Sequence, residues 1–298
     1  MKNILIIGCG LLGSSLLRKI KKKRIAKKIY IYEKSKANIS KIKKLKLPGT
    51  IVDKLQDGVI KSDLIILCTP MSEYKNLILK MNKFLTAKTI ITDIGSSKIE
   101  SSKIIKKFLR KDIVWTQGHP VSGSEVSGPE NGKQDIFENK WCVLIKDKNT
   151  KKKHLTILSN FWKKMGSKVI IMTAEKHDKI FSITSHLPHL IAYNLVKSAQ
   201  DFEKIQNYDL IKYSAGGLRD FSRIAASNEI MWRDIFFNNK QNITKAIDLF
   251  IKNLNSFKKD INSKNSKSIL KKLIQTKKVR TKIIKLKHDI NKPDFGRY

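Results

Sequence analysis

A short glycine-rich string near the start of the chain constrains the fold more than any other feature. Gly8-Cys9-Gly10-Leu11-Leu12-Gly13 is a G-x-G-x-x-G motif that directly follows an apolar run, Ile4 to Ile7, and opens a stretch with helical spacing. In such a motif the first glycine permits a tight turn, the second lets a phosphate approach the backbone, and the third lets helix and strand pack closely. The helix that follows favours an anion at its N-terminus. The string therefore predicts a strand, a turn and a helix that bind a dinucleotide through Gly8, Gly10, Leu11, Leu12 and Gly13.

The identity of the dinucleotide follows from a carboxylate further along. Glu33 stands at the end of the second apolar run, Ile29 to Tyr32, close to the spacing of about 20 residues that such sites use. A carboxylate there accepts both ribose hydroxyls of the adenosine and repels a 2′-phosphate. We therefore predict NAD rather than NADP, although Lys34 and Lys36 lie just beyond and weaken that preference.

The first half of the chain alternates short apolar runs with lysine-studded helical patterns, which is typical of βαβ units around a parallel sheet. The predicted strands are Ile4 to Ile7, Ile29 to Tyr32, Leu64 to Leu67, Thr89 to Thr92, Ile113 to Trp115 and Cys142 to Ile145, followed by Val169 to Met172. Because the first six runs are nearly continuous, we expect them to be buried on both faces. Residues 1–170 are predicted to form a Rossmann-type α/β domain with a mostly parallel sheet.

From Thr173 onward, helical periodicity replaces the strands, so residues 171–298 are predicted to form an all-α domain. Helical spacing of Ile and Leu continues from Ile269 to Leu286, within a basic, acid-poor segment that ends in Pro293-Asp294-Phe295-Gly296. A solvated helix with a frayed end is the plainer interpretation of this segment, and a nucleic-acid-binding tail is the alternative.

The chain of 298 residues carries 62 Lys and Arg against 25 Asp and Glu, a formal net charge of +37. Such a charge suits nucleic acid, a membrane surface or an anionic small molecule. Lysines spread over solvated helix faces explain it equally, and the aromatic residues fall mostly on core-facing positions rather than among the basic ones. We therefore expect no specific nucleic-acid partner.

The three cysteines, Cys9, Cys68 and Cys142, are too few and too scattered for a disulfide framework, which fits a cytoplasmic protein. No apolar run approaches the roughly 20 residues of a membrane-spanning helix. A signal peptide is disfavoured because glycines interrupt the first apolar run and the basic stretch follows it. We expect no membrane partner.

Further ligand contacts are expected where strands end, since ligands bind outside the carboxyl ends of parallel strands. Thr69 and Pro70 occupy one such end, and the string from Asp93 to Lys98 occupies another. The second string also suits the start of a helix capped by Ser96 or Ser97.

A dense cluster of small residues around one histidine follows the Ile113 strand. His119 can take a proton from a hydroxyl while hydride leaves the same carbon, as a dehydrogenase requires. We expect it at a strand end, on the same sheet edge as the glycine turn. In the helical half, His186 and His189 share a helix face, but no Cys or acid cluster completes a metal site.

Two arginine-containing strings follow, Gly216 to Ala225 and Met231 to Asp234. Arginines beside glycines suit the bidentate capture of a carboxylate. Ion pairing with Asp220 or Asp234 is the alternative role for Arg219 and Arg233.

Together these motifs resemble the prephenate dehydrogenase family, which includes arogenate and cyclohexadienyl dehydrogenases. The resemblance rests on the glycine turn and five further strings, which run in the family's order from about residue 3 to 255. The strings are Asp93-x-Gly-Ser-x-Lys98, His119-Pro-x-x-Gly-x-Glu-x-Ser-Gly128, Ser185-His-Leu-Pro-His189, Gly216-Gly-x-x-Asp-x-x-Arg223 and Met-Trp-Arg-Asp234.

The resemblance implies NAD-dependent oxidative decarboxylation of prephenate to 4-hydroxyphenylpyruvate and CO2, in tyrosine biosynthesis. It implies that His119 and Ser96 act on the ring hydroxyl, with Ser96 also near the nicotinamide. The implied substrate-binding residues are His189, Arg223, Glu125, Asp220, Gly216 and Trp232. The family's helical domains form homodimers, so Trp232 is expected to reach the pocket from the neighbouring subunit.

Two alternatives stay open within enzymes. An arogenate or dual-specificity enzyme would accept an ammonium in place of the side-chain ketone, and the motifs do not separate it from a prephenate enzyme. A hydroxyacid or pyrroline-carboxylate reductase is disfavoured because the Ser185 to His189 and Gly216-Gly217 strings stand where those enzymes place other residues.

Overall fold

The computed structural model describes residues 2–207 and 209–286. The chain separates into two compact units, Met1–Ile243 and Thr244–Tyr298, which are described here one at a time. This division does not coincide with the predicted domain boundary near residue 170, which stays a prediction. The string Pro293 to Gly296 lies outside the described residues.

The first unit is built on two sheets. The first contains β1 (Asn3–Ile7), β2 (Lys28–Tyr32), β3 (Thr50–Ile51), β4 (Leu64–Leu67), β5 (Ile90–Asp93) and β6 (Val114–Trp115). Its order is β3-β2-β1-β4-β5-β6, and every pairing is parallel. The second contains β7 (Gly118–Pro120), β8 (Trp141–Ile145) and β9 (Lys168–Met172) in the order β7-β8-β9, with β7 antiparallel to β8. The Rossmann-type fold class is confirmed.

All seven predicted strands are present, and β3 and β7 were not foreseen. β3 has only two residues, and β7 consists of Gly, His and Pro, which carry no strand signal. Strands β1, β4, β5 and β8 are almost wholly buried, as expected. Strand β2 is buried on one face only, and β6 lies at the sheet edge and is only partly covered, so the expectation of two buried faces is wrong for these two strands.

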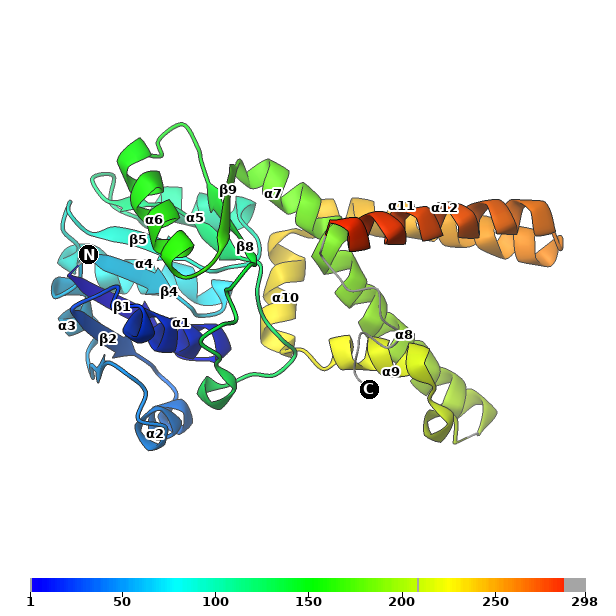
Figure 1. Cartoon of the computed structure of the whole chain (residues 1–298), viewed down its shortest axis with the longest axis horizontal. Helices are drawn as coiled ribbons and strands as arrows, with labels where there is room; N and C mark the ends of the chain where they lie inside the picture. The colour runs from blue at the N-terminus through cyan, green and yellow to red at the C-terminus, as the bar shows by residue number, and fades with distance from the viewer. Residues whose placement is uncertain (1, 208, 287–298) are drawn as a thin grey trace. The chain divides into compact units, whose positions relative to one another are not determined.

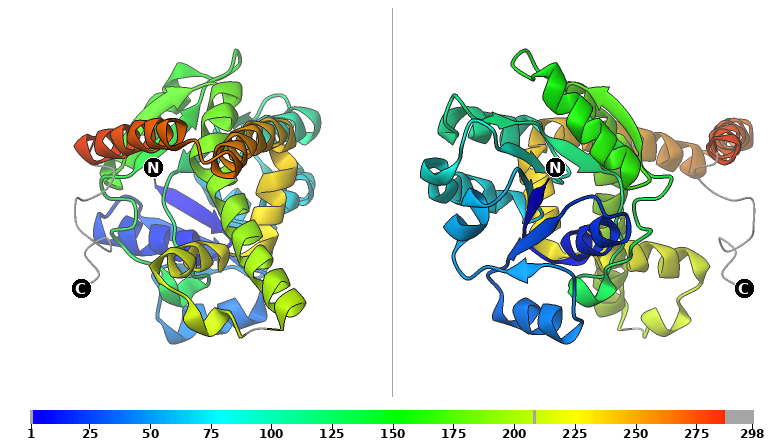
Figure 2. Two further views of the ribbon diagram at one scale, coloured as in Figure 1. Left: turned by 90° about the vertical axis from the view of Figure 1, so that its right-hand side faces the viewer. Right: turned by 60° about the vertical axis from the view of Figure 1, so that its left-hand side comes forward.

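Helices cover both faces of the first sheet (Figures 1 and 2). In the first half of the chain these are α1 (Leu11–Lys22), α2 (Lys36–Lys44), α3 (Leu55–Ile60), α4 (Tyr74–Met81), α5 (Ile99–Phe108) and α6 (Lys152–Lys164), with short turns η1 (Met71–Glu73), η2 (Asn82–Phe84) and η3 (Pro129–Asn131). One buried cluster joins alternate residues of β1 to α1 and α6, and the other joins the remaining residues to α3 and α4. The period-two alternation of a strand thus gives the sheet two separate cores.

The rest of the described chain is helical, as predicted. Its elements are α7 (Ala174–Phe181), the π-helical turn η4 (Ser182–His186), α8 (Leu187–Gln206), η5 (Ile211–Tyr213), α9 (Gly216–Ala225), α10 (Glu229–Asn238), α11 (Lys240–Asn262) and α12 (Ser266–Lys285). Helix α10 packs into the core on the α4 face of the sheet through Trp232 and Ile235. None of the helices in the described ranges combines the length and apolarity needed to cross a membrane.

Within the second unit, α12 follows the end of α11 after a short turn, and the two helices contact each other near that turn (Figure 1). The Nζ atom of Lys272 on α12 contacts Oδ2 of Asp260 and Oγ of Ser256, both at 2.6 Å. Many apolar side chains of this unit are exposed; they include Leu249, Leu254, Leu270, Leu273, Ile274 and Val279. The predicted helical spacing in the basic segment is confirmed as far as residue 286.

Candidate active site

The glycine turn connects β1 to α1 as predicted. Gly8 has φ +87°, a conformation that favours glycine, and a Cβ on Gly13 would lie 2.2 Å from the carbonyl oxygen of Gly8. Around Gly10, by contrast, a Cβ would meet nothing within 4 Å. The turn therefore needs Gly8 and Gly13 for its own geometry and leaves open space beside Gly10, where a pyrophosphate fits.

Glu33 lies beside that turn. Its Oε2 accepts a hydrogen bond from the backbone N–H of Cys9 at 2.8 Å, and its Oε1 accepts one from Ser35 at 2.9 Å. The carboxylate is thus held at the end of β2, next to the glycine turn. This is the position in which a carboxylate contacts an adenosine ribose.

A pocket of about 350 Å³ opens next to Gly8 and Glu33. Its lining includes the predicted Thr69 and Pro70, and also Tyr32, Lys34, Ser72, Glu73, Leu77, Ile230 and Arg233. The Oγ1 atom of Thr69 is buried without a hydrogen-bond partner in the described structure. An unsatisfied hydroxyl, the Glu33 carboxylate and an open glycine turn suit the polar groups of a dinucleotide.

The string after β5 forms a buried ion pair. Lys98 Nζ lies 2.7 Å from Asp93 Oδ2, and it also donates to the carbonyl oxygen of Gly118 at 2.5 Å. Helix α5 begins at Ile99, and neither Ser96 nor Ser97 caps it, so that prediction is wrong. The cap comes instead from Asp178, whose carboxylate accepts the backbone N–H groups of Lys98 and Ile99, each at 2.9 Å. Ser96 is half-buried between β5 and α5.

His119 does not lie at a strand end of the first sheet, as was expected. It is the central residue of β7 in the second sheet, where it pairs with Val143. The reason is that the chain turns after β6 and then forms β7, which pairs with β8 of the second sheet in the antiparallel direction. His119 is 7% exposed, and its Nδ1 lies 2.7 Å from Nε2 of His177. Burial, reinforced by the nearby charge of Lys98, holds the pKa of His119 well below its usual range, so its imidazole is neutral at pH 7.

The two histidines of the Ser185 to His189 string have different surroundings. His186 is fully buried, and its Nδ1 lies 3.1 Å from Nδ2 of Asn239. His189 is half-buried and stacks on Trp232, with ring centroids 3.8 Å apart. Desolvation and the charge of Arg223 lower the pKa of His189. Both imidazoles are therefore held in their neutral form.

Trp232 does not extend from its own chain towards a neighbouring subunit, so that expectation is wrong. Its side chain is 5% exposed and packs on His189 and Phe236 of the same chain. The physical reason is its place on α10, whose apolar face covers the first sheet. Trp232 thus covers one face of the His189 ring.

Helix α9 presents the second arginine string. Arg223 Nη1 lies 3.4 Å from Oε2 of Glu125, and both side chains keep substantial exposure, 43% and 31%. Gly216 begins the same helix, and Asp220 lies one turn before Arg223. The structure therefore brings Arg223 and Glu125 together at an accessible position. Arg233 pairs with Asp234 at 2.8 Å, as the alternative reading of that string proposed.

Sequence reasoning missed two groups of residues. His177 and Asp178 lie at the start of the helical half, and their only signal was a His-Asp pair on a short helix. Ile230 and Arg233 reach the dinucleotide pocket because α10 is anchored there, since Asp234 Oδ2 accepts the N–H of Ser72 at 2.9 Å. Ser72 and Asp234 are 162 residues apart, and no local sequence pattern predicts a contact over that separation.

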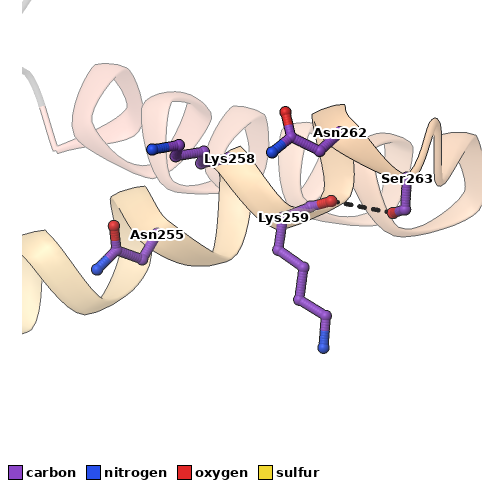
Figure 3. A pocket seen from close by; sticks show the side chains of 5 residues that line it. All are labelled: Asn255, Lys258, Lys259, Asn262 and Ser263. Carbon is purple, nitrogen blue, oxygen red and sulfur yellow. Dashed lines mark hydrogen bonds between the residues drawn. The ribbon is translucent and has the colours of Figure 1, made fainter.

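Elsewhere the second unit has a hollow along α11, lined by Asn255, Lys258, Lys259, Asn262 and Ser263. In Figure 3 the two lysine side chains point in different directions, and Ser263 is hydrogen-bonded to the carbonyl oxygen of Lys259. The two lysine side chains therefore do not converge on the hollow. In the part of the chain that the structure describes, no three His, Cys, Asp or Glu side chains come together as a metal site would require.

Comparisons with known proteins agree with this geometry. Residues 16–171 match the family described as prephenate dehydrogenase, nucleotide-binding domain, and residues 173–275 match prephenate dehydrogenase, dimerization domain. The chain is 32% identical to a cyclohexadienyl dehydrogenase of Zymomonas mobilis over 97% of this chain and 98% of that protein. It is 30% identical to a prephenate dehydrogenase of Bacillus subtilis over 90% of this chain and 72% of that one.

Among solved structures, prephenate dehydrogenase from Aquifex aeolicus, in complex with hydroxyphenyl propionate and NAD+, is 34% identical with a TM-score of 0.88. The match covers 95% of this chain and 98% of that one. Two family matches, in order and together spanning most of the sequence, agree with the expected fold. The chain belongs to the prephenate dehydrogenase family.

Proposed function

We propose that this protein is a prephenate dehydrogenase that uses NAD to convert prephenate to 4-hydroxyphenylpyruvate and CO2. The observation that carries the proposal is the neutral, buried imidazole of His119, within the same compact unit as the dinucleotide pocket. A neutral imidazole accepts a proton, and the reaction needs a base for the ring hydroxyl. The Aquifex aeolicus relative with NAD+ and a hydroxyphenyl compound supports both ligands.

The glycine turn, Glu33 and Thr69 would hold NAD, which when bound supplies the acceptor for the substrate's hydride. His119 Nε2 takes the proton of the ring 4-hydroxyl as that carbon loses hydride. Ser96 hydrogen-bonds the same hydroxyl and orients it. The ring carboxylate leaves as CO2, and its bonding electrons restore aromaticity, which makes the step strongly downhill. The proton held by His119 returns to the phenolate oxygen and gives the 4-hydroxyl of the product.

Substrate binding is assigned to the accessible end of the site. Arg223 offers a planar guanidinium for a substrate carboxylate, and its 3.4 Å contact with Glu125 is long for an ion-paired hydrogen bond. Asp220, Gly216 and Glu125 shape the polar surroundings. His189, stacked on Trp232, hydrogen-bonds the side-chain end of the substrate.

The second candidate is an arogenate or dual-specificity enzyme. It is favoured by the 32% identity to a cyclohexadienyl dehydrogenase over nearly the full length of both chains. The two candidates differ at the side-chain end, where arogenate carries an ammonium. A neutral His189 beside the cationic Arg223 disfavours a second cation there.

Steady-state kinetics on prephenate and arogenate, each with NAD and with NADP, test the proposal directly. We expect the highest kcat/KM with prephenate and NAD. The His119→Asn variant is the control, because it should bind NAD normally and lose at least 10²-fold in kcat. Turnover of neither substrate by the unaltered protein would refute the proposed function.

We also propose a homodimer. The family's second domain is described as a dimerization domain, and apolar side chains such as Leu254, Leu270 and Ile274 are more than half exposed in the second unit. Exposed apolar surface of this kind marks association sites. Sedimentation equilibrium should give twice the chain mass, and a monomer at micromolar concentration would contradict this assignment.

A further inference from the structure

His119, the base of the proposed function, is the first member of a buried row of three side chains. His119 Nδ1 lies 2.7 Å from His177 Nε2, and His177 Nδ1 lies 2.7 Å from Asp178 Oδ1. His177 and Asp178 are completely buried. Phe181 contacts both imidazoles, with ring centroids 4.8 Å and 4.4 Å from those of His119 and His177. Packing therefore fixes both ring planes.

The far end of the row is anchored. The carboxylate of Asp178 accepts the backbone N–H groups of Lys98 and Ile99 at the start of α5. These donors favour its ionised form against the burial that raises its pKa. Asn239 donates to the backbone carbonyl of the same residue at 2.8 Å, which holds α7 in place. Asp178 is thus an acceptor whose position is set by three separate elements.

An acceptor at one end dictates the proton positions along the row. Because an ionised carboxylate only accepts, Nδ1 of His177 must carry the proton that it donates. Burial and the charge of Lys98 hold the pKa of His177 well below its usual range, so it is neutral and its Nε2 accepts. His119 therefore donates from Nδ1, and its Nε2 is left with a lone pair.

We propose that His177 and Asp178 are positioning residues which fix His119 in the Nδ1–H tautomer and disperse the positive charge that it gains. When the hydroxyl O–H bond of the substrate breaks, a new N–H bond forms at His119 Nε2. The Nδ1 proton can then shift towards His177 Nε2, and the His177 Nδ1 proton towards Asp178. One proton enters the row, and one negative charge at its far end is offset.

The charges that face the row explain why this dispersal matters. The ammonium group of Lys98 disfavours a cation at His119, and the Asp93 carboxylate is already paired with Lys98. Asp178 is therefore the negative charge left to balance an imidazolium among these groups. His189 has no such connection, because its Nδ1 contacts the backbone oxygen of Ser185 instead. The row thus distinguishes His119 from His189.

The first test uses the ligand-free protein and is independent of its substrate. Imidazole ¹⁵N NMR should show both His119 and His177 protonated at Nδ1 at pH 7. In Asp178→Asn, which removes the acceptor-only end, the His119 signal should shift towards the Nε2–H tautomer. An Nε2–H tautomer of His119 in the unaltered protein would overturn the proposal.

The second test uses a conservative pair of variants on whichever substrate the unaltered enzyme turns over. In His177→Gln the amide oxygen can still accept from His119, so kcat should fall less than about 10-fold. His177→Phe keeps the ring shape but has no acceptor, and kcat should fall on the order of 10²-fold with KM for NAD unchanged. His154→Phe, on a half-exposed histidine of α6, is the matched control and should leave kcat unaltered.

Equal kcat values for the Gln and Phe variants would refute the tautomer role, whether both were high or both low. Should the Phe variant fail to fold, the NMR result and the Gln variant still decide. An unaltered protein that oxidises neither prephenate nor arogenate would refute the proposed function, while the NMR test of the row would stand by itself.

Discussion

The Nζ atom of Lys98 lies 2.7 Å from Oδ2 of Asp93, and both side chains are completely buried. The pair holds both backbone groups of Gly118, the residue before His119. Lys98 donates to the carbonyl oxygen of Gly118, and Asp93 Oδ1 accepts the backbone N–H of Gly118 at 3.3 Å. Tyr74 and Trp115 also donate to Asp93, at 2.9 and 3.2 Å. A buried ion pair satisfied in this way joins the end of β5 to the start of β7.

Removing one member of this pair should be costly. Lys98→Met leaves the Asp93 carboxylate buried without its cation, and breaking such a pair typically costs 3–5 kcal/mol. Because Asp93 keeps its other donors, we expect about 3 kcal/mol, measured by urea denaturation at pH 7. The double variant Asp93→Asn/Lys98→Met, which removes both charges, should recover part of the loss. A single variant as stable as the unaltered protein would show that the pair is not required.

Substitutions at two glycines of the turn should affect stability and cofactor binding separately. Gly13→Ala places a Cβ 2.2 Å from the Gly8 carbonyl oxygen, so helix and strand must move apart and Tm should fall by several degrees. Gly10→Ala places its Cβ in open space and should leave Tm unchanged. It should nevertheless weaken NAD binding at least 10-fold by calorimetry, because the methyl occupies the proposed pyrophosphate position. Normal NAD affinity in Gly10→Ala would show that the phosphates do not lie beside Gly10.

These glycines show where sequence reasoning succeeds. The turn, its helix and Glu33 are set by neighbours along the chain and by a fixed spacing, so a local pattern was sufficient. The long apolar strands were likewise recognised from their composition. β7 was missed because Gly, His and Pro owe their extended conformation to pairing with β8, not to their own propensities.

The remaining errors involve residues far apart in the sequence. The cap of α5 comes from Asp178, about 80 residues away, so Ser96 and Ser97 were reasonable candidates that tertiary structure replaced. Trp232 was placed across a subunit interface, whereas α10 turns it into its own core. Arg233 pairs with Asp234, which was the alternative role given for this arginine, and the two residues are adjacent in the sequence.

Arg223 offers a test of substrate recognition. Arg223→Ala should raise KM for substrate 10- to 100-fold with little change in KM for NAD, because a charged hydrogen bond to a carboxylate contributes about 1.5–3 kcal/mol. Arg223→Lys should recover only part of the affinity, since an ammonium cannot bind bidentately. Lys103→Ala, which removes an exposed cation paired with Glu100, is the matched control. An unchanged substrate KM in Arg223→Ala would show that Arg223 does not bind the substrate carboxylate.

The buried histidines should make stability fall in mild acid. Burial lowers the pKa of His186 to about 4, whereas an unfolded histidine has a pKa of about 6.5. Between these values the unfolded state binds more protons, so this contribution is complete above about pH 6.5 and is lost as pH falls towards 4. The shift corresponds to about 3 kcal/mol, and His119 and His177 act in the same direction. In His186→Gln, whose amide can still bond Asn239, urea unfolding between pH 7 and 4.5 should show a weaker pH dependence by about that amount. If the variant and the unaltered protein lose stability in parallel, His186 is not neutral in the folded state.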